Sequence, residues 1–277
     1  MKHINFRNDK EFLQNELTGN ISTKWAGQPV CVYESIDSTN LEAARLSKNG
    51  AGHGTVVVAQ TQTAGRGRRG RSWESPKGSN LYFSLLLRPK TEPVKAPMLT
   101  LVMAVALARA INQTAGCDVG IKWPNDLVAD GRKLCGVLTE MHLQKEKPAI
   151  EDVIIGVGIN VSDCEWPEEL RDKATSLERV CGRLIAPGKL WAQTMLIFEE
   201  LYEEFILAGD LTPIMETYNG LLVNLGREVT VLDPKGDYRG VAVGITPTGE
   251  LVVETADGER REVFAGEVSV RGIYGYV

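Results

Sequence analysis

Residues 96–116, APMLTLVMAVALARAINQTAG, form an almost wholly apolar stretch. The spacing of its side chains is helical, and Gly116 follows as a typical helix end. A helix that is apolar on nearly every side must lie inside a core. The stretch contains fewer than the roughly 18 uninterrupted apolar residues that a membrane span needs. The chain therefore folds around a buried helix, and 277 residues with 43% hydrophobic content suffice for one large core, with or without a small satellite domain.

The apolar pattern predicts further elements on both sides of this helix. Residues 9–17 indicate a short lead-in helix, and DSTNLEAARL indicates a helix that begins at Ser38 or Thr39. Residues 188–208 place large apolar side chains on one helical face, where core packing is expected rather than a cofactor site. Strands are predicted in PVCVYESI, GTVVVAQTQT, SNLYFSLLLRP and IEDVIIGVGINV, and VGIKWPNDLVADGRKLCGVLTEM indicates two strands joined by a turn at 129–132.

After Asn224 the texture of the sequence changes. REVTVLD, YRGVAVGIT, GELVVETA and REVFAGEVSV are short β-rich runs separated by PKGD, PTGE and ADGE turns. This pattern predicts a small antiparallel barrel or sandwich of about 50 residues. We therefore expect a large domain at 1–222, with residues 1–28 as its lead-in segment, and a C-terminal barrel at 223–277.

The cysteine and histidine patterns limit the setting in which the chain works. Five cysteines are scattered without a C-x-x-C pair, which favours reduced thiols over a disulfide framework or a zinc site. The three histidines also lack metal-ligand spacing, so no protein-bound metal is expected. Residues 1–9 are polar and lack the apolar core of a signal peptide, and these features together predict a cytoplasmic protein.

The stretch GRGRRGRSW at 65–73 carries four arginines in a chain of net charge −5. A nucleic-acid-binding protein spreads its basic excess over a face or a domain, whereas here the excess is local. Backbone N–H groups and arginine side chains suit phosphate or carboxylate oxygens. Taken alone, the stretch fits a solvated surface loop equally well. It lies between two predicted strands, so we expect a loop that stays mobile until an anion binds.

Two other motifs are unusual for strands. In KWPND, the Trp123–Pro124 step restricts the backbone between Lys122 and the polar pair that follows. In GVGIN, both glycines allow either tight packing or the close approach of a ligand. GVGIN lacks the spacing of a dinucleotide-binding fingerprint, and the chain has no P-loop. Lys133 at a strand start would by itself usually be an ordinary surface residue.

Together these motifs carry a resemblance. SIDSTN, QTQTAGRGRRGRSWESPKGSNLYFSLLLRP, KWPNDL, RKLCGVLTE and GVGINV occur in the order and spacing of biotin protein ligases, and the resemblance runs from about residue 30 to the C-terminus. It implies an α+β fold: a mixed β-sheet with helices on one side, like the cores of class II aminoacyl-tRNA synthetases and lipoate ligases, plus a small SH3-like barrel. It also implies that the Gly/Arg loop closes over biotin and its adenylate.

The activity that the resemblance implies has two steps. The carboxylate of biotin attacks the α-phosphate of ATP in the presence of Mg²⁺, giving biotinoyl-5′-AMP and pyrophosphate. A lysine of a biotin carboxyl carrier domain then displaces AMP. Cations suit this chemistry because they offset the like charges of carboxylate and triphosphate. ATP and Mg²⁺ serve as co-substrate and activator, biotin serves as substrate, and no tightly bound prosthetic group is expected.

The resemblance also implies roles for individual residues. Lys133 bridges the carboxylate and the α-phosphate, Arg68 holds the activated group, and Asp126 is the candidate base for the incoming lysine. The residues expected at biotin are Ser38, Thr39, Gln62, Gly65, Arg66, Arg68, Lys133, Gly136, Leu138 and Gly156. The residues expected at the nucleotide are Arg66, Arg68, Arg69, Lys122, Trp123, Asn125, Lys133 and Asn160. Short polar side chains must meet the neutral ureido ring of biotin, because an unpaired buried polar group costs about 1–3 kcal/mol.

The sequence departs from the family pattern at two places. Many relatives carry an N-terminal DNA-binding domain and repress an operon, but only about 30 residues precede the first predicted strand here, too few for a helix-turn-helix, so no specific DNA partner is expected. Some relatives cover the adenine with an aromatic residue just before the TSL element. Ala174 stands there in this chain, and Trp166 is the remaining candidate. No membrane partner is expected, and a homodimer stays open.

Two alternative functions remain. A lipoate or octanoate ligase would use the same scaffold, but its ligand has no ureido group, and a site aimed at one should reject it by up to about 10⁴-fold. A non-enzymatic nucleic-acid-binding regulator would use the arginine stretch and the terminal barrel, and its affinity would fall steeply with salt. The net charge of −5 and the ligase motifs favour the enzyme.

Overall fold

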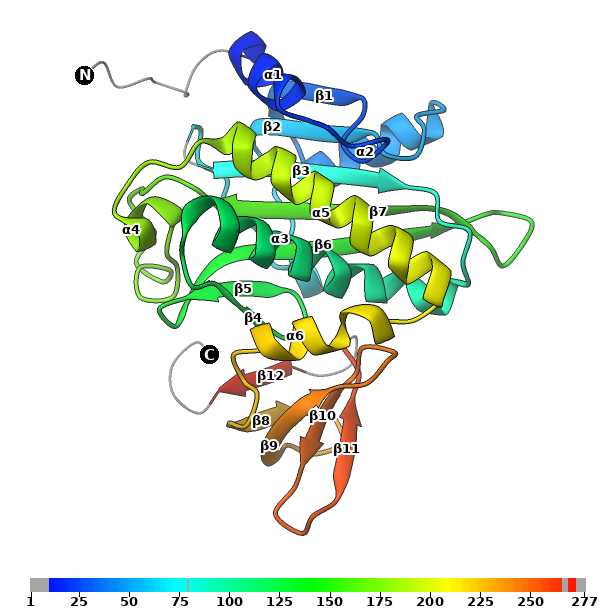
Figure 1. Cartoon of the computed structure of the whole chain (residues 1–277), viewed down its shortest axis with the longest axis vertical. Coiled ribbons are helices and arrows are strands. Elements are labelled where there is room, and N and C mark those ends of the chain that lie inside the picture. Colours follow the sequence, from blue (N-terminus) through cyan, green and yellow to red (C-terminus); the bar gives the residue numbers. More distant parts are fainter. Residues whose placement is uncertain (1–9, 79, 266–268, 273–277) are drawn as a thin grey trace.

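A seven-stranded mixed sheet forms the centre of the large domain. The computed structural model describes residues 10–78, 80–265 and 269–272, and the strands of this sheet run in the order β1-β2-β3-β7-β6-β5-β4 (Figure 1). β1 and β2 are parallel, and all other neighbouring pairs are antiparallel. The strands are β1 (Val30–Ile36), β2 (Val56–Gln62), β3 (Asn80–Leu87), β4 (Gly120–Lys122), β5 (Asp126–Ala129), β6 (Arg132–Leu143) and β7 (Ile150–Asn160).

The central strands of the sheet are buried on both faces. β3 and β7 are apolar along almost their whole length, as expected for strands covered on two sides. Successive side chains of a strand point to opposite faces. On β2, Val56 and Val58 therefore join the main core, whereas Val57 joins a smaller apolar cluster on the other face.

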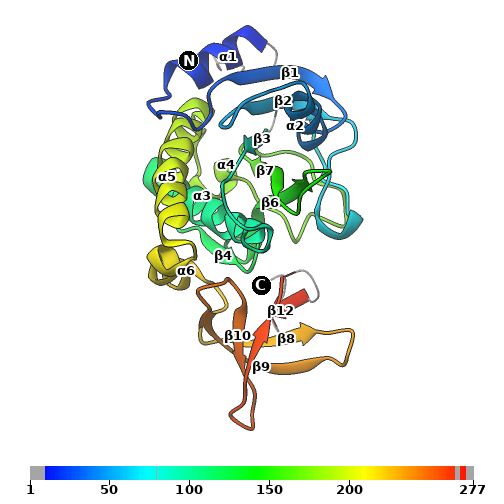
Figure 2. The ribbon, with the colours of Figure 1, turned by 90° about the vertical axis from the view of Figure 1, so that its right-hand side faces the viewer.

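Helices cover the two faces unequally. The buried helix predicted at 96–116 is α3 (Leu99–Ala115), which ends at Gly116 in the left-handed conformation and packs with α5 (Pro187–Ala208) on the main core. α2 (Thr39–Lys48) lies on the opposite face, where its Ala43 packs in the smaller cluster (Figure 2). The expected α+β class with a mixed sheet is confirmed. The expected arrangement had helices on one side of the sheet. α2 departs from it, because its apolar side packs on the other face, in the smaller cluster.

α3 and the preceding 3₁₀ turn η2 (Pro93–Met98) form a helix that is long and apolar enough to cross a membrane by length and composition. However, 72% of its most apolar 18-residue window is buried inside the protein. This burial agrees with the core position that the sequence predicts for the stretch.

The C-terminal strands form a second, five-stranded antiparallel sheet in the order β11-β10-β9-β8-β12, drawn below the large domain in Figure 1. Four short strands were predicted after Asn224, and the described residues form five, because the run REVFAGEVSV contributes to two strands instead of one. They are β8 (Glu228–Leu232), β9 (Tyr238–Ile245), β10 (Leu251–Glu254), β11 (Arg260–Val263) and β12 (Ser269–Gly272). The domain boundary near residue 223 stays a prediction.

The lead-in segment is anchored to the large domain. The helix predicted at 9–17 is α1 (Lys10–Gly19), which packs on β1 and α5, while residues 1–9 lie outside the described residues. After α1, the buried Glu199 of α5 accepts hydrogen bonds from the backbone N–H groups of Lys24, Trp25 and Ala26 at 2.7–2.9 Å. Burial raises the pKa of Glu199, but these N–H donors outweigh it and hold the pKa below its ordinary value.

The short helical elements lie in connections. They are η1 (Arg68–Gly70), α4 (Leu177–Cys181), η3 (Thr212–Ile214) and α6 (Met215–Leu221). The expectation of five reduced thiols is wrong at two positions, because Cys117 and Cys181 form a disulfide between the segment after α3 and the end of α4. A separation of 64 residues hides this pairing from the sequence. Cys31, Cys135 and Cys164 are free.

The region 119–141 contains one strand more than expected. The turn at Asp130–Gly131 joins β5 and β6 as predicted, with positive φ at both residues. Residues 120–122, however, form the separate strand β4, which pairs with β5. The Trp123–Pro124 peptide bond between them is cis, so the backbone of KWPND does have the special geometry that its X-Pro step indicated.

Candidate active site

A cleft lies on the face of the sheet that carries α2. It is bounded by the start of α2, by β6 and β7, and by residues 63–78 between β2 and β3, which we call the arginine loop. The predicted site residues that line the cleft are Ser38, Thr39, Gln62, Arg66, Arg68, Asn125, Lys133, Gly136, Leu138 and Gly156. The fold thus brings together residues that are far apart in the sequence.

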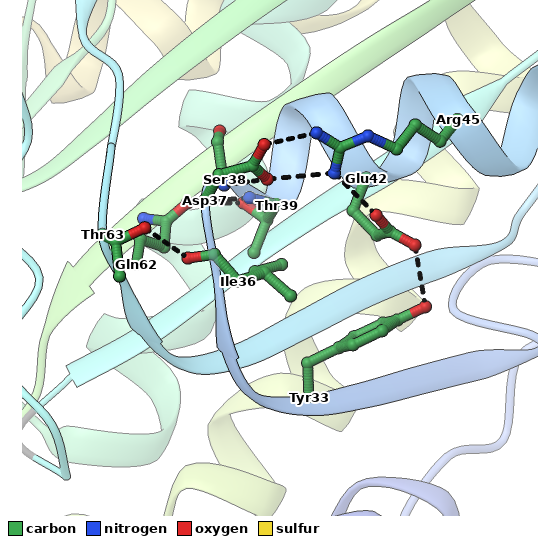
Figure 3. Close-up of polar contacts among 9 residues, drawn as sticks. All are labelled: Tyr33, Ile36, Asp37, Ser38, Thr39, Glu42, Arg45, Gln62 and Thr63. Atoms are coloured by element: carbon green, nitrogen blue, oxygen red, sulfur yellow. Dashed lines mark hydrogen bonds and ion pairs between the residues drawn. The ribbon is translucent and has the colours of Figure 1, made fainter.

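The start of α2 supplies small polar groups. Ser38 is the N-cap residue, but its side chain makes no capping hydrogen bond. Instead, Gln62 Oε1 accepts from the backbone N–H of Thr39 at 2.8 Å and from its hydroxyl at 3.2 Å. Figure 3 shows Asp37 beside this point, bound to Arg45 of the same helix. Hydrogen bonding to Arg45 lowers the pKa of Asp37, so this carboxylate is matched by a cation.

Glycines on β6 and β7 allow other groups to approach the sheet. Gly136 pairs with Gly158 across the two strands. A Cβ atom on Gly158 would lie 2.5 Å from Trp73 Cε2, and one on Gly136 would lie 2.9 Å from Trp73 Cζ3. A Cβ atom on Gly156 would lie 2.0 Å from Asn40 Oδ1. Of the two alternatives for GVGIN, the structure shows tight packing, because the groups that meet the two glycines are the protein's own indole and carboxamide.

The indole of Trp73 fills much of the cleft. Lys133 Nζ lies 5.2 Å from the centroid of its ring, in cation–π range. The indole N–H is buried and has no hydrogen-bond partner within the part of the chain that the structure describes. The remaining cavity is about 50 Å³, whereas small-molecule sites usually exceed about 300 Å³. A ligand must therefore move the indole, and an acceptor atom on that ligand would satisfy its N–H group.

Lys133 is held firmly at the edge of the cleft. Its backbone N–H donates to the carbonyl of Lys173 at 2.7 Å, and its carbonyl accepts from the N–H of Thr175 at 2.9 Å. The buried Asn160 supports this segment by donating to the carbonyl of Thr175. Lys133 Nζ forms an ion pair with Asp126 at 2.6 Å. An anionic ligand thus meets a cation whose backbone is fixed and whose charge is already matched by a carboxylate.

The arginine loop is held over the cleft by two of its arginines. Arg66 forms an ion pair with Glu140 of β6 at 3.0 Å. Arg68 donates to Asn125 Oδ1 at 2.7 Å and to the backbone carbonyl of Ala265, which follows β11 of the C-terminal sheet. Burial lowers the pKa of Arg68. These partners all accept hydrogen bonds, so phosphate or carboxylate oxygens can replace them.

Some predicted site residues lie beside the cleft rather than on its surface. Trp123 is 3% exposed, and its indole N–H donates to the carbonyl of Gly249 in the C-terminal domain. Arg69 is exposed and has a positive φ of 57°. Trp166, the candidate for covering the adenine, is buried and does not line the cleft. The predicted residues outside the lining are Gly65, Arg69, Lys122, Trp123, Asp126 and Asn160.

Sequence reasoning gave no role to three groups that shape the site. The indole of Trp73 packs on Gly158 inside the cleft, and Asn40 Nδ2 donates to Glu140 Oε2 at 2.7 Å, next to Arg66. The motifs that carry the resemblance contain all of these residues. The available signal was the single aromatic residue at the end of GRGRRGRSW, but its direction depends on the path of the loop.

The geometry defines a class of site. The cleft is lined by the cationic side chains of Arg66, Arg68 and Lys133 and by neutral polar side chains at the start of α2, which suits a small molecule that carries both anionic and neutral polar groups. Arg66, Arg68 and Lys133 all bind groups of the protein itself. Within 10–78, 80–265 and 269–272, no group of three or more His, Cys, Asp or Glu residues forms a metal site.

Comparisons with known proteins identify the family. Residues 32–160 match the biotin/lipoate A/B protein ligase family, and residues 225–271 match the biotin protein ligase C terminal domain. The bifunctional ligase/repressor BirA of Bacillus subtilis (strain 168) is 36% identical over 93% of this chain and 78% of its own length. The biotin--[acetyl-CoA-carboxylase] ligase of Paracoccus denitrificans is 30% identical over 85% of this chain and 98% of its own length.

A solved structure adds a similarity of fold. The biotin protein ligase from Aquifex aeolicus in complex with biotin and ATP aligns with a TM-score of 0.76 and 31% identity, covering 88% of this chain and 99% of that one. The fold and the matches thus define a protein ligase. The chain belongs to the biotin protein ligase family.

Proposed function

We propose that the protein activates biotin with ATP and transfers the biotinoyl group to a lysine of a biotin carboxyl carrier domain. The observation that carries this proposal is the convergence of Lys133, Arg66 and Arg68 on one cleft that short polar side chains also line. In the first step a carboxylate oxygen of biotin bonds to the α-phosphorus and pyrophosphate leaves. In the second step the lysine amine bonds to the acyl carbon, loses a proton, and AMP leaves.

Lys133 is the central cation of the first step. Its ammonium has three protons, so Nζ can keep its ion pair with Asp126 while donating to the biotin carboxylate and to the α-phosphate. The attraction offsets the repulsion between these two anions and grows as charge develops on the phosphoryl oxygens. Asp126 is then a carboxylate beside the reacting groups, positioned to take the proton that the acceptor lysine loses.

The arginine loop supplies the remaining cations and excludes water. Arg66 and Arg68 exchange their contacts with Glu140 and Asn125 for oxygens of the bound ligands. A mixed anhydride hydrolyses readily in water, and a closed loop prevents this side reaction. The same loop carries Trp73. Once its indole has left the glycine-lined part of the cleft, the ring offers an aromatic face for the adenine. Stacking of a base on an aromatic side chain is worth about 1–3 kcal/mol.

The neutral polar side chains of the cleft suit the ureido ring of biotin. Ser38, Thr39 and Gln62 line the cleft and provide hydroxyl and carboxamide groups. Groups of this kind can pair with the two N–H donors and the carbonyl acceptor of the ring. Mg²⁺ is expected to arrive on the phosphates of ATP, because proteins usually bind it through one or two carboxylates together with substrate phosphates.

The proposal is tested by analysing the products. The purified protein is incubated with ATP and Mg²⁺ in the presence of biotin, lipoate or neither, and the products are separated by mass spectrometry. Of the three reactions, only the one with biotin is expected to give an acyl-AMP, namely biotinoyl-AMP. Addition of a biotin carboxyl carrier domain should convert this product to biotinylated carrier. A carrier whose acceptor lysine is replaced by arginine is the control. Comparable lipoyl-AMP would indicate a lipoate ligase, and no acyl-AMP at all would contradict the proposal.

A further inference from the structure

Ser75 lies behind the cleft, near the end of the arginine loop. The residue is 8% exposed and does not line the cleft. Its hydroxyl accepts a hydrogen bond from Gln62 Nε2 at 3.0 Å and donates one to the carbonyl of Trp73 at 3.1 Å. Its own carbonyl accepts from the hydroxyl of Thr61 at 2.7 Å, which fixes its backbone to β2. Ser75 can therefore influence a ligand only through the residues it holds.

The direction of these hydrogen bonds is determined by groups that have one role. The backbone N–H of Thr39 can only donate, so the Gln62 atom that faces it must be the oxygen Oε1. The carbonyl of Trp73 can only accept, so the Ser75 hydroxyl donates to it and receives its own hydrogen bond from Gln62 Nε2. We call these four residues, Thr39, Gln62, Ser75 and Trp73, the carboxamide relay.

The relay leaves one donor available to the cleft. Gln62 Oε1 accepts from both donors of Thr39, and one proton of Nε2 binds Ser75. A primary amide has two N–H protons, and Gln62 lines the cleft, so the second proton is left for a ligand. Without Ser75, the carboxamide would be held only at Oε1. The whole planar group could then pivot about that atom and turn its NH₂ away from the cleft.

Gly65 gives independent support for the relay. A Cβ atom at this position would lie 2.4 Å from the carbonyl oxygen of Trp73, 2.9 Å from Ser75 Oγ and 3.3 Å from Gln62 Nε2. Any side chain there would collide with two atoms of the relay and press against a third. The first glycine of GRGRRG is therefore required where the loop passes the relay.

We propose that Ser75 is a positioning residue for biotin recognition. Its hydroxyl fixes the Gln62 carboxamide so that one N–H group is presented to the cleft, and it joins that orientation to the backbone of Trp73 in the arginine loop. This inference rests on the proposed function, because it assigns the ligand of Gln62 as biotin. A positioning role predicts weaker biotin binding with little change in the chemical step.

The test is a double-mutant cycle in the full-length protein. Pyrophosphate release is measured against biotin and ATP for the wild type, Ser75→Ala, Gln62→Ala and the double variant. Loss of one neutral hydrogen bond should raise the KM for biotin about 3- to 10-fold in Ser75→Ala, with kcat and the KM for ATP unchanged. In the Gln62→Ala background the same substitution should have no further effect. Ser75→Thr keeps the hydroxyl and should restore the KM for biotin.

Ser72→Ala is the matched control, because Ser72 is an exposed serine of the same loop. It should behave like the wild type, and thermal melting of every variant checks the fold. A wild type that makes no biotinoyl-AMP would overturn the proposed function together with this inference. If the wild type is active, two results overturn the inference alone: an unchanged KM for biotin in Ser75→Ala, or an equal additional loss in the Gln62→Ala background.

Discussion

The two faces of the large sheet differ in how their polar groups are satisfied. On the face covered by α3 and α5, the buried carboxylate of Glu199 binds three backbone N–H groups, while the indole N–H of Trp191 has no partner among the described residues. On the cleft face, Lys133 binds Asp126, Arg66 binds Glu140, and the indole N–H of Trp73 likewise has no partner there. The difference lies in the charged groups: the carboxylate of the first face is held by backbone donors, whereas the cations of the second face pair with side chains that the oxygens of a ligand can replace. Stability and activity should therefore respond to different substitutions.

The largest effect on activity is expected from Lys133→Ala. Loss of a charge-assisted hydrogen bond of about 1.5–3 kcal/mol in the transition state should lower the rate of adenylate formation roughly 10- to 150-fold or more. The melting temperature should change little, because the backbone bonds of Lys133 remain. Pyrophosphate release and thermal melting measure the two effects. A near wild-type rate would show that Lys133 takes no part in adenylate formation.

Coupling between the two ligands should be the next largest effect. Ordering the loop costs roughly 1–2 kcal/mol of backbone entropy per residue, and a bound carboxylate gathers its cations before the nucleotide arrives. A biotin analogue that keeps the carboxylate but cannot react should therefore raise the affinity for non-hydrolysable ATP about 5- to 150-fold. Calorimetry measures this factor, and linkage requires the same factor in the reverse order. Equal nucleotide affinity, with unchanged amide exchange at 65–71, would show that the loop is no lid.

A smaller effect on activity is expected from Gly158→Ala. The added methyl group would lie in the space that the indole of Trp73 occupies, 2.5 Å from its Cε2 atom. It would remain there after a ligand displaces the indole, and it would narrow the space for that ligand. Overpacking costs about 1–3 kcal/mol, and the lower end applies because the loop can move, so a 5- to 10-fold rise in the KM for substrate is expected. Gly52→Ala is the control, since a Cβ atom there meets nothing within 4 Å. A similar rise of the KM in both variants would show that narrowing of the cleft is not its cause.

The smallest effect on activity is expected from Glu199→Gln, which should act on stability alone. An amide cannot accept from all three N–H groups as the carboxylate does, and an unpaired buried donor costs about 1–3 kcal/mol of unfolding free energy. Because the pKa of Glu199 is held below its ordinary value of 4.5 in the folded state, its extra stabilisation is complete above that pH. It is lost as the pH falls through the lowered folded pKa.

Denaturant unfolding as a function of pH tests this expectation. The wild type should exceed Glu199→Gln in stability by a constant amount above about pH 4.5, and the difference should shrink in acid. Activity per folded molecule should stay at the wild-type level. A gap that widens in acid, or a fall in kcat, would show that the two faces are not independent.

The sequence predicted those elements that their local residue pattern identifies without tertiary information. α3 is apolar on nearly all sides, and the C-terminal strands are separated by clear turns, so both were found. An amphipathic pattern does not say which face of a sheet a helix covers, so the position of α2 required the structure. Local spacing likewise cannot pair Cys117 with Cys181 across 64 residues.

Prediction of the site had the same limit. The motifs named Lys133 and Gln62, and the structure places both on one cleft, although their roles stay predictions. The position of the Trp73 indole depends on the path of the arginine loop and on the pairing of Gly136 with Gly158 on neighbouring strands. Both are tertiary properties. Ser75 was hidden for a similar reason, since an isolated serine has no distinguishing local pattern.

Biotin-dependent exchange between ATP and labelled pyrophosphate tests most directly whether the cleft activates biotin. The exchange requires only the reversible first step, so it needs no carrier domain and reports on the cleft alone. With ATP and Mg²⁺, exchange is expected in the presence of biotin, not with lipoate or without an acid, and it should be strongly reduced in Lys133→Ala. Exchange that is independent of biotin, or that persists unchanged in Lys133→Ala, would contradict adenylate formation at this site.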